Sequence, residues 1–127
     1  MVWVSTIDIQ SKMEFFQKFL KQNSNLAIIS GIIDNDICEC RYTAIGKIIL
    51  FDIGYGKAIL EYNKKYKIGV IPTKLRPPHD LEFAVRGNDR TYIIYISAGA
   101  MYITPTQNNL PSDVPPYIFV NICYLLK

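Results

Sequence analysis

Ile71-Pro72-Thr73-Lys74-Leu75-Arg76-Pro77-Pro78 is the stretch of sequence that decides the fold. Proline has no backbone N–H to give to a sheet ladder, so Pro72 ends the strand that precedes it. The proline pair fixes two more φ angles and holds Arg76 in an extended conformation. We expect a stiff, non-helical corner in which Leu75 points inward while Lys74 and Arg76 point outward.

Strand-like segments surround this corner. Runs rich in β-branched and aromatic residues follow one another from residue 26 onward, separated by glycine, asparagine or proline turns. This pattern is typical of an all-β antiparallel fold. We predict a jelly-roll-like β-sandwich over residues 26–127, with nine strands at 26–33, 37–43, 47–53, 57–61, 66–71, 81–86, 90–97, 100–104 and 117–126.

A helical pattern precedes that domain, within a lead-in of residues 1–25. Ser11-Lys12-Met13-Glu14 has the form of a capping box. The apolar stripe that follows consists of Met13, Phe16 and Leu20, flanked by Phe15 and Phe19. We predict one short amphipathic helix at 11–22. A helix of this length is not stable alone, so its stripe must pack against the domain or against copies of itself.

Composition limits the partners. The chain has 127 residues, a net charge of +3, and no apolar run long enough to cross a bilayer, so we expect no membrane insertion. A basic cluster at residues 64–67 is interleaved with tyrosines and could be a nucleic-acid patch. The sequence pI of 8.7 is below the usual basic footprint, and a solvated hairpin loop is the preferred interpretation. We expect no nucleic-acid partner.

The three cysteines predict free thiols. Cys38 and Cys40 stand two apart on one strand, so both point to the same face. With Cys123 they are expected to fill the core, reduced, in a protein assembled in a reducing cytosol. His79 is distant from them in sequence, and no metal-ligand spacing occurs. We expect no metal.

Catalytic patterns are equally sparse. The acidic residues show no spacing diagnostic of paired carboxylates, although such a pair is formed in space rather than in sequence. No glycine-rich loop precedes a helix, which argues against the usual nucleotide sites. Asp34-Asn35-Asp36 lacks the glycine and distal glutamate of a calcium loop. We expect no enzyme and no cofactor.

Four blocks of sequence carry a resemblance. They are Cys40 to Leu50, the corner Ile71 to Pro77, the hairpin Tyr92 to Ile103, and the terminal Ile122 to Leu125. In order and spacing they resemble the head domains of phage tail-fibre and baseplate receptor-binding proteins. The chain departs from that family with Leu75 where an aromatic residue is common and Lys74 where glycine is usual.

The resemblance implies a function. Such heads are β-sandwiches, usually homotrimers, that bind a host-surface glycan or protein without cofactor or catalysis. The protein would then belong to a virion tail or fibre, contact other tail proteins, and be assembled in the cytoplasm of a bacterial host. A structural virion assembly protein and a cellular lectin-like module are the alternatives; a depolymerase is the least favoured.

The residues alone also favour an oligomer. Several runs, such as 92–96 and 117–120, are apolar at consecutive positions, so one face can enter the core while the other needs a partner. Closed symmetry is the usual way to cover identical apolar faces. The number three comes only from the resemblance.

Strand parity predicts where the ligand binds. If successive strands are antiparallel, their connections alternate between two ends of the sandwich. The turns at 34–36, 54–56, 73–80 and 98–99 would then share the end away from the helix. This end would carry the ligand-binding residues Asp34, Asn35, Asp36, Tyr55, Arg76 and His79.

Overall fold

The computed structural model describes Glu14, residues 28–107 and residues 115–127. The helix predicted at 11–22 lies outside these residues, apart from Glu14, as does the rest of the lead-in.

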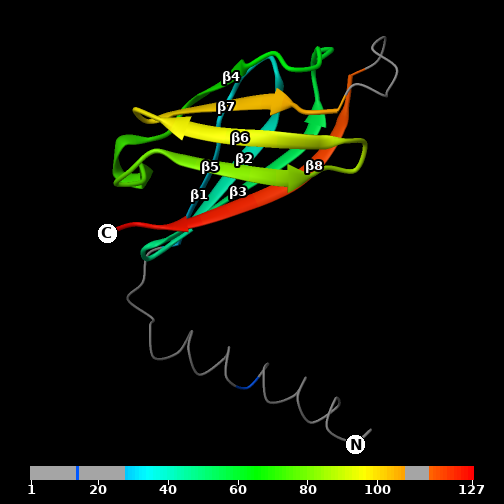
Figure 1. Cartoon of the computed structure of the whole chain (residues 1–127). Helices are drawn as coiled ribbons and strands as arrows, with labels where there is room; N and C mark the ends of the chain where they lie inside the picture. Colours follow the sequence, from blue (N-terminus) through cyan, green and yellow to red (C-terminus); the bar gives the residue numbers. More distant parts are fainter. Residues whose placement is uncertain (1–13, 15–27, 108–114) are drawn as a thin grey trace, which may run out of the picture.

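Eight strands form two four-stranded antiparallel sheets (Figure 1). Sheet A has the order β1-β2-β3-β8, with bounds Ile28–Ile32, Cys38–Ile45, Ile48–Gly56 and Tyr117–Leu125. Sheet B has the order β4-β7-β6-β5, with bounds Tyr66–Val70, Ala100–Pro105, Thr91–Ser97 and Leu81–Arg86. The all-β prediction with antiparallel sheets is confirmed.

The inner faces of both sheets supply one hydrophobic core. Side chains alternate between the two faces of a strand, and β8 follows this rule along its whole length, with its even-numbered residues 118–124 buried. Sheet A contributes Cys38, Cys40, Ile49, Phe51, Ile53, Ile118 and Ile122, and sheet B contributes Ile68, Tyr92, Ile94, Ile96, Met101 and Ile103. The residues on the outer face of sheet A therefore take no part in this core.

The strand order differs from a jelly roll. A jelly roll combines two Greek keys. Sheet B has Greek-key order, because β4 lies beside β7 and the corner connects it to the far strand β5. Sheet A is instead a meander of β1, β2 and β3 completed by the last strand, so the jelly-roll-like topology that we predicted is wrong.

One predicted strand is absent. Residues 57–61, which the pattern assigns to a ninth strand, belong to a connection from sheet A to sheet B. Leu60 is buried in the core there, and its carbonyl accepts a 2.9 Å hydrogen bond from the Arg90 guanidinium. Asn63 N–H donates to the Pro105 carbonyl at 2.9 Å. Leu60 thus fills the core without strand pairing, while Ile59 is exposed, and the strand prediction for this segment is wrong.

The proline corner closes against the neighbouring hairpin. After β4, Thr73–Leu75 forms one 3₁₀ turn, and Leu75 is buried as predicted. The Arg76 side chain is half-buried rather than turned outward, because its Nε donates to the Ile71 carbonyl at 2.8 Å. The Tyr124 hydroxyl donates to the Leu75 carbonyl, which fixes the corner at that end of β8.

Candidate functional site

The outer face of sheet A changes character along its strands. Directly opposed residues of neighbouring strands share a face, so the register sorts this surface into rows. One row, the apolar band, contains Ile28, Ile45, Ile48 and Leu125. The next contains Ser30, Thr43, Leu50 and Cys123, and the following one Ile32, Arg41, Asp52 and Asn121. Beyond these lies the aromatic cluster: Tyr55, Tyr117 and Phe119.

The aromatic cluster is exposed although it is large and apolar. Relative exposures are 50% for Tyr55, 53% for Tyr117 and 48% for Phe119. The Tyr55 ring meets Phe119 edge-on at 4.7 Å and Tyr117 at 5.4 Å between centroids. The Tyr117 and Phe119 rings are nearly parallel, with 12° between their planes. Such mutual contacts hold the rings in place and leave ring surface open to a ligand.

An irregularity in the ladder positions this cluster. Ile53 pairs with Val120, and Tyr55 pairs with Tyr117, so Gly54 faces two residues of β8. Phe119 has a φ of 49°, in the left-handed region that bulky residues avoid. Strained residues and bulges concentrate where a side chain is re-aimed for function. Here the bulge sets the Phe119 ring beside Tyr55.

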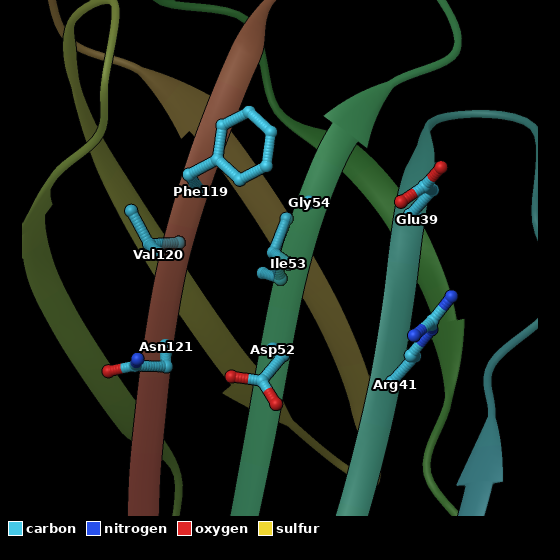
Figure 2. A pocket seen from close by; sticks show the side chains of 8 residues that line it. All are labelled: Glu39, Arg41, Asp52, Ile53, Gly54, Phe119, Val120 and Asn121. Carbon is cyan, nitrogen blue, oxygen red and sulfur yellow. The ribbon is translucent and has the colours of Figure 1, made fainter.

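A hollow of about 290 Å³ adjoins the cluster. Figure 2 shows it spanning three adjacent strands, with Glu39 on β2, Gly54 on β3 and Phe119 on β8. Gly54 forms part of its floor, and a Cβ there would lie 2.8 Å from a Glu39 carboxylate oxygen. The glycine therefore leaves the space between Glu39 and Phe119 open.

Four polar side chains line the hollow without partners. Within the part of the chain that the structure describes, no hydrogen bond or ion pair engages the side chains of Glu39, Arg41, Asp52 or Asn121. In Figure 2 the Arg41 guanidinium points along the strand toward Glu39, and Asp52 points toward Asn121. Together they offer carboxylate acceptors, guanidinium donors and an amide that does both. All four are exposed, so they are free to exchange water for a ligand.

The turn at 34–36, which was predicted to bind ligand, is stabilised by hydrogen bonds of its own Asn35. Asn35 Oδ1 accepts hydrogen bonds from the N–H groups of Ile37 and Cys38, at 2.8 and 2.9 Å. The Asn35 carbonyl accepts a 3.0 Å hydrogen bond from Lys57 Nζ. Asp34 and Asp36 are exposed on either side of it. Asn35 therefore stabilises the β1–β2 turn, and Tyr55 is the one predicted residue that joins the aromatic cluster.

Arg76 and His79 lie at the other end of the domain. Both line a separate hollow of about 360 Å³ beside Pro77, Asp80 and Gly99. The corner is fixed at Tyr124, seven residues along β8 from Tyr117, which is about 23 Å in a strand.

The prediction that the turns at 34–36, 54–56, 73–80 and 98–99 share one end is wrong. The strand expected at 57–61 does not exist, and its loss reverses every strand direction after it. The six predicted residues therefore divide between two surfaces, and their role in ligand binding stays a prediction.

Sequence reasoning missed most of this surface. It did not select Glu39, Arg41, Asp52, Tyr117, Phe119 or Asn121. A signal was available: Asp52 interrupts an otherwise apolar run in β3, and Asn121 interrupts one in β8. The register that brings these residues together was not available from one sequence.

The cysteines are free thiols, as predicted, with one correction. Cys38 and Cys40 are buried on the inner face, and burial raises the pKa of each thiol from 9.0 to about 12. Cys123 is exposed on the outer face, so its predicted place in the core is wrong. Its odd-numbered position in the β8 alternation turns it outward.

Over residues 28–107, 115–127 and Glu14, no three histidine, cysteine, aspartate or glutamate side chains are grouped to hold a metal ion. Among the same described residues no helix is long and apolar enough to span a membrane.

No family model matches the chain, and no curated protein matches it.

Proposed function

We propose that this protein is a non-catalytic carbohydrate-binding domain that holds a saccharide on the outer face of sheet A. The observation that carries the proposal is the aromatic cluster standing beside four unpartnered polar side chains. Apolar rings with a few convergent polar groups are typical of small-molecule sites.

A sugar suits this chemistry in two ways. Its C–H faces are apolar and pack on the rings of Tyr55, Tyr117 and Phe119, while its hydroxyls donate to and accept from polar side chains. Glu39, Arg41, Asp52 and Asn121 surround the hollow where those hydroxyls would lie. The polar residues that line the hollow are exposed at the surface of the sheet, which suits the end or edge of a glycan chain.

Binding without hydrolysis is the form that we propose. A glycosidase needs a carboxyl group whose environment keeps it protonated so that it can act as an acid. Glu39 and Asp52 line the same hollow, but both are exposed. Exposure leaves neither carboxyl group in the apolar surroundings that such an acid requires, so the two side chains suit hydrogen bonding to sugar hydroxyls.

The biological setting that we propose comes from the sequence resemblance to phage tail-fibre heads. In that setting the saccharide belongs to a host-cell surface and the domain is part of a virion tail. A cellular lectin-like module would use the same surface in the same way. A structural assembly protein is the rival from another class; the apolar band supports it as a protein interface, and it predicts no glycan binding.

A glycan array probed with the full chain tests the proposal. We expect binding to at least one saccharide, reduced tenfold or more in Tyr117→Ala, because a truncated aromatic anchor at a binding site removes about 1.4 kcal/mol or more. Tyr62→Ala is the matched control, since Tyr62 is 48% exposed but lies on the connection at 57–65. An array without a hit, or equal loss in the two variants, contradicts the proposal.

A further inference from the structure

The apolar band leaves four aliphatic side chains in one row with too little cover. Ile28 is 61%, Ile48 40% and Leu125 67% exposed, and Ile45 is half-buried between them. Leu50 and Cys123 extend the apolar surface into the next row. Contiguous apolar patches of this kind on a domain surface mark a docking site.

We propose that residues 11–22 of the same chain cover the apolar band, with the stripe Met13, Phe16 and Leu20 against it. This contact does not depend on saccharide binding, because the proposed saccharide site lies at the opposite end of the same face. It commits to an intramolecular contact, because three observations point to the chain's own preceding segment as the occupant.

The first observation is chain continuity. β1 begins at Ile28, and Ile28 is itself a member of the apolar band. Only residues 23–27 separate it from the segment at 11–22. Five residues reach about 17 Å when extended, and the four strands of sheet A span about 14 Å from first to last. The segment can therefore cover the band from where it is attached.

The second observation is complementarity. The apolar stripe of 11–22 is the one strongly amphipathic helical pattern in the sequence, and a helix so short needs a surface to pack on. Lys12, Lys18 and Lys21 occupy the other side of the pattern and would face water. Aromatic and aliphatic side chains would thus meet the four aliphatic residues of the band.

The third observation is that the segment is covalently attached to the domain through only five residues, 23–27. A connection of a few residues gives the attached segment an effective concentration of the order of millimolar at the band, whereas a second copy competes only at its bulk concentration. At micromolar protein the segment in the same chain has the advantage.

A native thiol makes the contact measurable. Cys123 lies two residues before Leu125 on the same face, and it is exposed, whereas Cys38 and Cys40 are buried. In the full chain with Phe16→Cys, mild oxidation should join the introduced thiol to Cys123 by a disulfide within one molecule. Lys18→Cys, on the opposite side of the helical pattern, is the matched control and should cross-link at least tenfold more slowly.

Each outcome decides the matter. Rapid cross-linking of Phe16→Cys at the mass of one chain supports the proposal. A disulfide-linked dimer shows that a second copy covers the band and overturns the intramolecular contact. Equal rates for Phe16→Cys and Lys18→Cys overturn it as well, since they show no preferred side.

A second measurement needs no introduced thiol. Maleimide labelling of Cys123 should be slow in the wild-type chain and at least tenfold faster in Leu20→Asp, with Lys18→Asp as the unchanged control. The rate should not depend on protein concentration. Equal labelling in all three proteins, or protection that appears only at high concentration, would overturn the proposal.

Discussion

The two ends of the outer face of sheet A differ although the same three strands, β2, β3 and β8, build both. At one end stand Ile45, Ile48 and Leu125, in regular register. At the other end stand aromatic rings, a ladder irregularity at Gly54 and a left-handed Phe119. The aliphatic end suits the permanent contact that we propose for it, and the aromatic end suits a ligand that exchanges with solvent.

The difference is informative because the fold does not demand it. The inner face of sheet A must be apolar throughout, and it is. The outer face does not have to be apolar for the sheets to pack. The chemistry of its side chains therefore indicates which partners they contact. Strain at Phe119 supports this view, since a left-handed residue other than glycine costs roughly 1 kcal/mol or more and persists where the surroundings impose it.

The sharpest test of the comparison substitutes one residue at each end. Phe119→Gly should weaken saccharide binding by about 2 kcal/mol, roughly 30-fold, because it removes a central ring. Its free energy of unfolding should stay within about 1 kcal/mol of wild type, since glycine accepts the positive φ without strain. Titration calorimetry and urea unfolding measure the two quantities.

Leu125→Ala is the matched change at the other end. It should leave the saccharide affinity unchanged, because Leu125 lies in the apolar band and not beside the hollow. A loss of affinity in Leu125→Ala as large as that in Phe119→Gly would mean that the two ends are one site.

The pH dependence of the free energy of unfolding distinguishes the cysteines on the two faces of sheet A. The folded pKa of Cys38 and of Cys40 is about 12, against 9.0 for an unperturbed thiol, because both are buried. Between these values the folded chain holds protons that the unfolded chain releases. The free energy of unfolding should therefore fall as pH rises above 9, by up to about 1.4 kcal/mol per pH unit for each thiol.

Urea unfolding at pH 8, 9 and 10 measures this decline. The double variant Cys38→Ala/Cys40→Ala should show a much smaller slope, whereas Cys123→Ala, on the outer face, should keep the wild-type slope. Burial also raises the pKa of Tyr92 and Tyr124, but tyrosines add to the decline only above about pH 10. An unchanged slope in the double variant would contradict the assigned burial.

Much of the fold follows from local sequence. Runs of β-branched and aromatic residues, with the turn residues between them, predict segments that overlap all of the observed strands, and the prolines predict the corner with Leu75 inside. The failure at 57–61 has a physical cause. Leu60 is buried as a strand residue would be, but its backbone bonds to the side chain of Arg90, some 30 residues away. Only tertiary structure shows that contact.

The candidate site was less accessible to sequence reasoning. Arg41, Asp52 and Asn121 are neighbours only because β2, β3 and β8 pair in one register. Periodicity shows which residues share a face of one strand, but not which strands are adjacent. Because the sequence predicted a strand at 57–61 that does not exist, Arg76 and His79 were assigned to the wrong end of the domain. The predicted trimer and virion location remain predictions that light scattering and localisation in virions would test.

The most direct test of saccharide binding at the aromatic end is an NMR titration of the full chain with the strongest glycan from the array. Backbone amide shifts should change for residues 39–41, 52–55 and 117–121, around the hollow and the aromatic cluster. Ile45, Ile48 and Leu125 should not shift, because they lie at the opposite end of the face. Shifts centred on the apolar band, on sheet B or on the hollow at Arg76 would contradict the account.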